Sequence, residues 1–290
     1  MDYKTGYIAV IGCQLAWGFL PMFWHALMPI DSAIIILYRI LTMFIYCLIA
    51  AKFQYSWKRI FEPLKDKAVR RKYFTAGFIL TINWSVYIWA INSGRVVQAS
   101  IGYYIEPIVI CLFGIVFFHE KITKYNAAAM FMALIAIAVI LFHFRQLPGV
   151  ALGLALTWAT YSAIKKTAEQ PPMISLVYET MLYAAIALVI IIVLECRGMG
   201  GLSYNVPGKY ALMMLSGLVT CIPVGLFAVA AKKVSLFVIG LAQYISPTIT
   251  LFIGIFIFRE PIDKVQILAF VIVWIGLVFF TMGEVKNVKK

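Results

Sequence analysis

The chain has 290 residues, of which 63% are hydrophobic and only 13% are charged, and its formal net charge is +13. Soluble domains average about half apolar and a quarter charged residues, so this composition excludes a soluble domain and, because charge is so sparse, a disordered chain. It indicates an integral membrane protein with most of its length in the bilayer. The five cysteines are scattered without a C-x-x-C spacing, which argues against a disulfide framework or a metal site.

Ten apolar runs follow one another along the chain, each about as long as the roughly 20 residues that a helical span needs. They are continuous rather than alternating, which favours membrane helices over a β-barrel. We therefore predict an all-α integral membrane protein with ten transmembrane helices. The predicted spans are 6–28, 31–51, 73–92, 97–118, 125–143, 148–165, 174–194, 210–231, 236–258 and 264–282.

The positive charges are distributed unevenly between the predicted loops. The loop at 52–72 and the other loops on the same side as the N-terminus hold most of the lysine and arginine residues. Because cytoplasmic loops are enriched in these residues, we predict a multi-pass protein of the cytoplasmic membrane with both termini in the cytoplasm. The positive net charge is then explained by membrane topology rather than by nucleic-acid binding. An alternative role of the 52–72 loop is to bind anionic lipid or a partner protein.

An internal repeat becomes visible when the sequence is shifted by 140 residues. The segments 102–122 and 242–262 are identical at eight of 21 positions, including a proline, a glycine and a glutamate. We predict two five-helix repeats, at 1–146 and 147–290. Because five is an odd number, the second repeat must enter the membrane from the opposite side, and such inverted repeats are typical of alternating-access transporters.

The repeated Tyr-x-x-Pro, Gly and Phe-x-Glu pattern resembles the EamA repeats of the drug/metabolite transporter superfamily. The segments Tyr38-Arg39, Asn83-Trp84 and Gln243–Thr248 make the chain most similar to the RarD family. This resemblance covers nearly the whole chain and implies a ten-helix secondary transporter. Glu106 departs from the pattern, because it stands where the family is expected to carry asparagine.

Ionisable residues inside membrane spans are costly, so the few that occur here are informative. Arg39 and Glu106 lie about 12 Å and 14 Å along spans that both start from the predicted outer face, which places both near the midplane. We hypothesise that they face one cavity and pair; a permanent structural ion pair, or Arg39 bound to helix carbonyls, are the alternatives. Glu179 either lines the inner vestibule or sits at a solvated helix end near Lys165. Glu106 and Glu179 are the candidates for proton coupling.

Aromatic and amide residues recur at helical spacing near the middle of several spans. A cavity lined by aromatic rings and a few polar groups suits a small, mostly apolar organic solute, whereas ordinary aromatic packing between helices is the alternative explanation. The predicted substrate-cavity residues are Gln14, Trp17, Arg39, Asn83, Trp84, Tyr87, Tyr103, Glu106, Trp158, Tyr161, Glu179, Gln243 and Tyr244.

Four further residues of the repeated segments are predicted to have structural or gating roles. Glu120 and Glu260 follow the fourth helix of each repeat, where a carboxylate is unfavourable unless a neighbouring loop or helix N-terminus donates hydrogen bonds to it. Pro107 and Pro247 each remove a helix hydrogen bond and favour a kink.

The predicted function is a secondary active transporter of small organic metabolites or amphipathic drugs, with protons as a candidate coupling ion. A facilitator or a channel-like pore is the alternative, and a membrane enzyme is a distant one, because no nucleotide-binding loop and no hydrolase or metalloprotease motif occurs. We therefore predict no enzymatic activity, no metal and no cofactor. The expected partners are a small-molecule substrate and the lipid bilayer, with the chain acting as a monomer.

Overall fold

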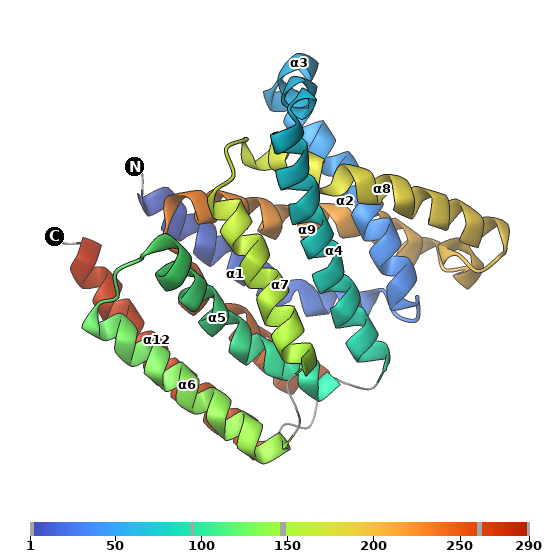
Figure 1. Cartoon of the computed structure of the whole chain (residues 1–290). Helices are drawn as coiled ribbons and strands as arrows, with labels where there is room; N and C mark the ends of the chain where they lie inside the picture. Colours follow the sequence, from blue (N-terminus) through green and yellow to red (C-terminus); the bar gives the residue numbers. More distant parts are fainter. Residues whose placement is uncertain (1–2, 94–95, 146–148, 260–262, 289–290) are drawn as a thin grey trace.

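The computed structural model describes residues 3–93, 96–145, 149–259 and 263–288, and every regular element in these ranges is a helix (Figure 1). The first repeat contains α1 (Tyr3–Ala26), α2 (Ser32–Gln54), the short α3 (Trp57–Phe61) and η1 (Glu62–Lys65), α4 (Lys67–Asn92), α5 (Val96–Phe118) and α6 (Lys124–Phe144). The second contains α7 (Gly149–Lys166), α8 (Pro172–Cys196), η2 (Gly201–Tyr204), α9 (Pro207–Lys233), α10 (Leu236–Ala242), α11 (Ile245–Ile253), η3 (Gly254–Phe258) and α12 (Lys264–Val288).

Each predicted span overlaps a helix or a run of helices. Within the described ranges, eight helical segments are long and apolar enough to cross a membrane. The two predicted spans that fall short of this apolar character are α4 and α7, which carry inward polar residues such as Asn83 and Lys165. The protein is therefore a multi-pass membrane protein, and the count of ten crossings stays a prediction.

The ninth predicted span is interrupted at Gln243 and Tyr244, between α10 and α11. Pro247 lies four residues after Gln243 and has no N–H group to donate to the Gln243 carbonyl, so the regular hydrogen-bond ladder cannot continue there. The Ser246 N–H donates to that carbonyl instead, at 3.3 Å. By contrast, α5 runs without interruption through Pro107. Only one of the two repeats therefore has a broken fourth helix.

The internal repeat is visible in the positions at which helices start. The pairs α2 and α8, α4 and α9, α5 and α10, and α6 and α12 each begin 140 residues apart, as Ser32 and Pro172 illustrate. This spacing equals the sequence shift that relates the two repeated segments. A residue and its counterpart 140 positions later are therefore called equivalent below.

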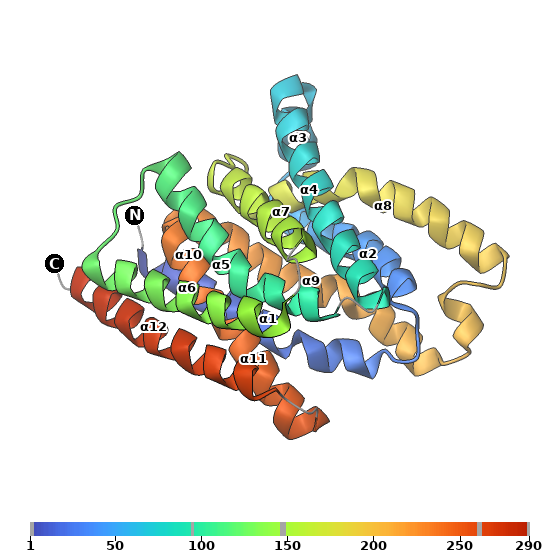
Figure 2. The same cartoon turned by 60° about the horizontal axis from the view of Figure 1, so that its bottom comes forward.

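Repeat-related helices pack against each other in opposite directions. In the pair α6 and α12, Asn126 near the start of α6 donates to Glu284 near the end of α12 at 3.4 Å, while His143 and Asp263 meet at 3.0 Å at the other end. In the pair α2 and α8, Tyr38 near one helix start donates to Glu195 near the other helix end at 2.5 Å. The two repeats therefore run in opposite directions, as an inverted repeat requires (Figure 2).

The repeats are interleaved rather than separate lobes, because α1 packs on α9 of the second repeat and α7 packs on α4 of the first. The Tyr7 hydroxyl, near the start of α1, donates to Glu284, so the two ends of the chain lie on one face of the bundle (Figure 1). We call this the terminal face. The opposite face carries the loop hydrogen bond from the Asp31 N–H to the Tyr204 hydroxyl, at 3.2 Å. The cytoplasmic location of the terminal face stays a prediction.

Candidate functional site

The break between α10 and α11 brings a polar side chain against Glu106. The Gln243 amide nitrogen donates to a Glu106 carboxylate oxygen at 2.9 Å, and the Gln243 amide oxygen is buried without a hydrogen-bond partner. The neighbouring Tyr244 is fully buried, and its hydroxyl donates to the Tyr104 carbonyl of α5 at 2.8 Å. Since Tyr104 and Tyr244 are equivalent residues, this bond joins the two repeats at the point where they cross.

Arg39 projects from α2 onto aromatic rings rather than onto a carboxylate. Its guanidinium carbon lies 4.0 Å from the centre of the Trp84 ring and 5.5 Å from that of Trp24. The hypothesis that Arg39 and Glu106 pair is wrong for this conformation, because Glu106 is engaged by Gln243 and no ion pair with Arg39 forms among the described residues. Their similar predicted depth in the membrane does not bring the two side chains into contact with each other.

Two tyrosines that contact each other, Tyr87 and Tyr103, lie near Arg39. The rings of Tyr87 and Tyr103 meet edge to face with centroids 6.1 Å apart, and the Tyr103 hydroxyl lies within electrostatic reach of both Arg39 and Glu106. Tyr103 nevertheless keeps 44% of its surface exposed, and the other four side chains are only partly buried. We call Arg39, Trp84, Tyr87, Tyr103 and Glu106 the central cluster. Its five members belong to the predicted cavity set, and the protein leaves part of each side chain uncovered.

The other predicted aromatic residues form a closed core. Trp17 of α1 packs edge to face on Trp158 of α7 at 5.3 Å, and Phe227 of α9 contacts Trp17, Trp158 and Tyr161. Phe227 is fully buried and was not among the predicted residues. In this conformation these rings pack against one another between the helices, which is the alternative to a substrate cavity.

The two predicted amide side chains on α1 and α4, Gln14 and Asn83, differ in their hydrogen bonds. Asn83 donates from its amide nitrogen to the Leu154 carbonyl at 3.0 Å and to the Thr157 hydroxyl at 2.9 Å, so it fastens α4 to α7. Gln14 is 1% exposed, and its amide nitrogen has no hydrogen-bond partner. Asn83 thus has a packing role here, whereas Gln14 keeps an unused donor inside the bundle.

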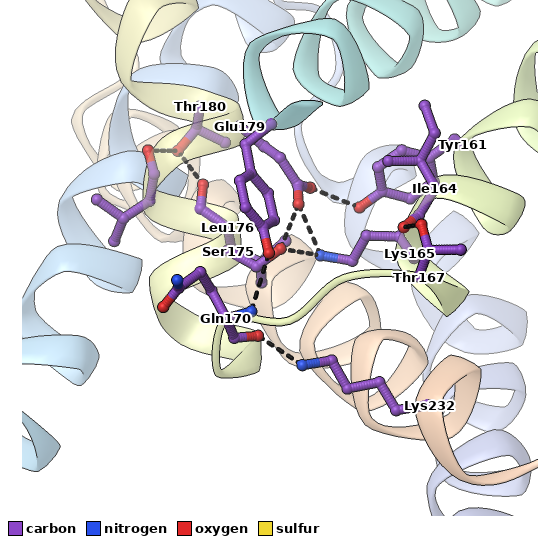
Figure 3. Close-up of polar contacts among 12 residues, drawn as sticks. Tyr161, Ile164, Lys165, Thr167, Gln170, Ser175, Leu176, Glu179, Thr180 and Lys232 are labelled. Atoms are coloured by element: carbon purple, nitrogen blue, oxygen red, sulfur yellow. Dashed lines mark hydrogen bonds and ion pairs between the residues drawn. The ribbon is translucent and has the colours of Figure 1, made fainter. Parts of the chain in front are cut away.

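Nearer the terminal face, Glu179 belongs to a buried polar network (Figure 3). The Lys165 ammonium donates to a Glu179 oxygen at 2.7 Å, and the side chains are 1% and 0% exposed. Ser175 donates to the same oxygen at 2.5 Å, while the Tyr161 hydroxyl donates to the other oxygen at 2.9 Å. The alternative that placed Glu179 at a solvated helix end is therefore wrong. We call Tyr161, Lys165, Ser175 and Glu179 the buried network.

Sequence reasoning missed Lys165 and Ser175 as members of this network. A signal was present, because Tyr161 and Lys165 are four residues apart on α7, and Ser175 and Glu179 are four residues apart on α8. Residues at this spacing share one helix face. Two such pairs on consecutive helices predict a shared polar contact if the helices meet.

The loop between α7 and α8 is tied down over this network. Lys72 of α4 donates to the Thr167 carbonyl at 2.5 Å. Lys232 of α9 donates to the Gln170 carbonyl at 2.5 Å (Figure 3). The Gln170 N–H donates to the Tyr73 hydroxyl at 2.9 Å. Contacts from two other helices thus close the bundle over the buried network at the terminal face.

Glu120 contributes to the same closure. Its carboxylate accepts hydrogen bonds from the Leu236 and Phe237 N–H groups at the start of α10, at 2.8 Å and 2.9 Å, and lies 3.4 Å from the Lys166 ammonium. A helix N-terminus is a favourable environment for a negative charge, which offsets the unfavourable end of its own helix. Its equivalent, Glu260, lies outside the described residues.

Unpartnered polar atoms mark the interior of the bundle. Six buried side-chain nitrogen or oxygen atoms of the described residues lack a hydrogen-bond partner, and four of them belong to predicted cavity residues: Gln14, Arg39, Trp158 and Gln243. Buried polar groups are nearly always hydrogen-bonded, so these four side chains are unusual in their lack of a protein partner. Among the residues that the structure describes, no group of three or more His, Cys, Asp or Glu side chains could hold a metal ion.

Comparison with known proteins identifies the family. The model of the EamA-like transporter family matches this chain twice, at residues 4–142 and 149–282. The chain belongs to the EamA-like transporter family. The resemblance suggested by the repeated motif is therefore confirmed, and this family membership makes the protein a membrane transporter.

Several relatives align with this EamA-like chain over nearly its full length. An uncharacterized transporter, YojE of Bacillus subtilis, is 34% identical over 98% of this chain and 96% of its own length. Protein RarD of Streptomyces exfoliatus is 29% identical over 100% and 92%, and that of Escherichia coli is 23% identical over 97% and 95%. A solved structure with 14% identity superposes with a TM-score of 0.75 over 97% of this chain and 98% of its own, which supports the fold.

Proposed function

We propose that this protein is a secondary active transporter that moves small organic metabolites or amphipathic drugs by alternating access. The solute site is the central cluster between the two inverted repeats. The terminal face, which includes the buried network and the α7–α8 loop, is the gate that is closed in this conformation. In alternating access, inverted repeats exchange conformations, so each half adopts in turn the arrangement that the other has now.

The observation that carries this proposal is the contrast between two equivalent positions. Arg39 and Glu179 are 140 residues apart, on the equivalent helices α2 and α8. Glu179 is fully enclosed by its network, whereas Arg39 keeps accessible surface beside the partly exposed Tyr103. An inverted repeat with one enclosed half and one accessible half fits a carrier that is closed toward a single side.

The chemistry of the central cluster supports an organic solute. Trp84, Tyr87 and Tyr103 provide aromatic faces, and Arg39 and Glu106 provide charged groups, a combination that orients a small amphipathic molecule. One chain suffices for this site, so we propose a monomer in the cytoplasmic membrane, with both termini in the cytoplasm. Protons remain the candidate coupling ion, with Glu106 and Glu179 as the carboxylates that would carry them.

Thiol accessibility tests the closed gate. On a background in which the exposed Cys196 is replaced by serine, we expect Tyr103→Cys to react with a membrane-impermeant thiol reagent from only one side of oriented vesicles. Ser162→Cys is the matched control, because Ser162 is fully buried in α7 and should stay unreactive from both sides. A cysteine at 103 that faces lipid would not meet such a reagent, so lack of labelling from both sides contradicts an aqueous cavity.

Transport kinetics separate a carrier from the alternative functions. We expect uptake into proteoliposomes to saturate with solute concentration and to show counterflow, because a carrier returns its site loaded with either labelled or unlabelled solute. A first solute can be found by screening metabolites, amino acids and amphipathic drugs for a rise in the thermal stability of the purified protein. Flux that neither saturates nor shows counterflow would support a channel-like pore instead.

A further inference from the structure

Arg39 is a cation inside the bundle that pairs with no carboxylate of residues 3–93, 96–145, 149–259 and 263–288. It lies about two helical turns into α2, counted from Ser32. An arginine at the centre of a membrane helix is costly, and such residues usually pair with a neighbouring group. No carboxylate of the described residues forms an ion pair with Arg39.

The acidic groups nearest along the fold are already engaged by other partners. Glu106 accepts from Gln243, and Glu195 accepts from the Tyr38 hydroxyl and the Leu202 N–H. Asp31 caps its own helix by accepting from the Ala33 N–H. None of these carboxylates contacts the guanidinium in this conformation, so the described residues leave it without a counterion.

In the second repeat, the residue equivalent to Arg39 does have a counterion from the protein. Glu179, equivalent to Arg39, contacts Lys165 at 2.7 Å. The helices α1 and α7 end 140 residues apart, at Ala26 and Lys166, so the residue equivalent to Lys165 is His25. The His25 ring stacks on Phe258 with centroids 4.5 Å apart. The first repeat therefore combines two basic residues where the second combines an acid and a base. This difference leaves a positive site only in the accessible half.

The surroundings of Arg39 leave its hydrogen-bonding edge free. The Arg39 guanidinium carbon lies 4.0 Å from the centre of the Trp84 ring, and the Arg39 Nε atom is buried without a hydrogen-bond partner. Aromatic rings hold a guanidinium by its face, so its N–H donors stay in the plane, where they match the two oxygens of a carboxylate. Tyr87 and Tyr103, whose rings contact each other, lie within electrostatic reach of Arg39.

We propose that Arg39 binds the carboxylate of the transported solute, and that Trp24, Trp84 and Tyr103 receive its apolar or aromatic body. This assignment rests on the proposed function, because it names the substrate class of the same central cluster. The solute then supplies the negative charge that the protein supplies by itself in the buried network. An organic carboxylate with an aromatic body is thus the preferred class over a neutral or cationic solute.

Binding of simple aromatic probes to the full-length protein in nanodiscs tests the assignment. The probes are benzoate, phenyl phosphate, benzyl alcohol and benzylamine, followed by tryptophan fluorescence and thermal stability. We expect wild-type protein to bind benzoate in preference to the other three. In Arg39→Gln, benzoate affinity should fall roughly tenfold to a hundredfold, which corresponds to the loss of hydrogen bonds to a charged group. Arg197→Gln, which removes an exposed arginine elsewhere, should bind as wild type does.

Several results would overturn the assignment. They are unchanged benzoate affinity in Arg39→Gln, no benzoate binding to the wild type, or equal binding of benzyl alcohol. Phenyl phosphate binding through Arg39 in place of benzoate would also overturn it, in favour of a phosphate ester. If Arg39→Gln does not fold, Arg39→Lys replaces it, because lysine keeps the charge but not the two-pronged geometry; its affinity should fall several-fold, and unchanged affinity would count against the assignment.

The assignment and the proposed transport fail in different ways. Arg39-dependent benzoate binding without counterflow of any solute would contradict transport and leave the carboxylate site standing. Saturable counterflow of neutral solutes that is unaffected by Arg39→Gln would contradict the carboxylate site and leave transport standing.

Discussion

Replacing Glu179 by leucine is expected to lower the free energy of unfolding by about 3–5 kcal/mol, the range found when one partner is removed from a buried ion pair. The Lys165 side chain is 1% exposed, so its ammonium would lose its counterion without gaining water. Ser175 alone would remain as a hydrogen-bond partner, at 2.7 Å. Unfolding of the purified protein in detergent, followed by tryptophan fluorescence, measures the change.

Two further variants show whether the charge is responsible. The double variant Lys165→Met with Glu179→Leu should regain most of the lost stability, because it removes the unpaired charge along with its partner. Glu169→Gln is the matched surface control: Glu169 lies 3.9 Å from Lys72 with its side chain 83% exposed, and such pairs contribute only about 0–1 kcal/mol. A Glu179→Leu variant as stable as Glu169→Gln would mean that the buried network does not form in the folded protein.

The spans and the repeat could be predicted from sequence because both depend on features that leave a local trace. Continuous apolar runs fix the approximate ends of membrane helices, and the predicted start at 31 lies next to the observed start at Ser32. The break at Gln243 was only anticipated as a kink near Pro247. Apolar residues continue on both sides of that break, so hydrophobicity gives no sign of it, and only the missing N–H group of the proline does.

The contacts within the site were harder to predict, because depth in the membrane is only one coordinate. Arg39 and Glu106 lie at similar depth, but the rotation of α2 and α5 turns one toward Trp84 and the other toward Gln243. The sequence leaves open whether Glu179 lines the inner vestibule or sits at a solvated helix end near Lys165, and it does not predict that Lys165 is buried. Its burial depends on the way in which the α7–α8 loop, α4 and α9 cover it, and this long-range packing leaves no local pattern in the sequence.

The second large predicted effect comes from replacing Glu106 and concerns the rate of transport rather than stability. Glu106→Leu removes the acceptor for the Gln243 amide, which would then be unpaired at a helix break inside the membrane. Hydrogen bonds to charged groups contribute about 1.5–3 kcal/mol, so we expect uptake to fall roughly tenfold or more. Glu106→Gln keeps an acceptor of the same size and should retain more uptake than Glu106→Leu. Ser246→Ala, at the equivalent position of the second repeat, is the matched control.

The same pair of variants tests proton coupling, because Glu106→Gln keeps the hydrogen bond and removes the ionisable group. If Glu106 carries the coupled proton, solute accumulation driven by an imposed pH gradient should disappear in Glu106→Gln, while exchange at equal pH on both sides continues. The measurement compares gradient-driven uptake with counterflow in the same proteoliposomes. Gradient-driven accumulation that persists in Glu106→Gln would exclude Glu106 as the coupling residue and leave Glu179 as the candidate carboxylate.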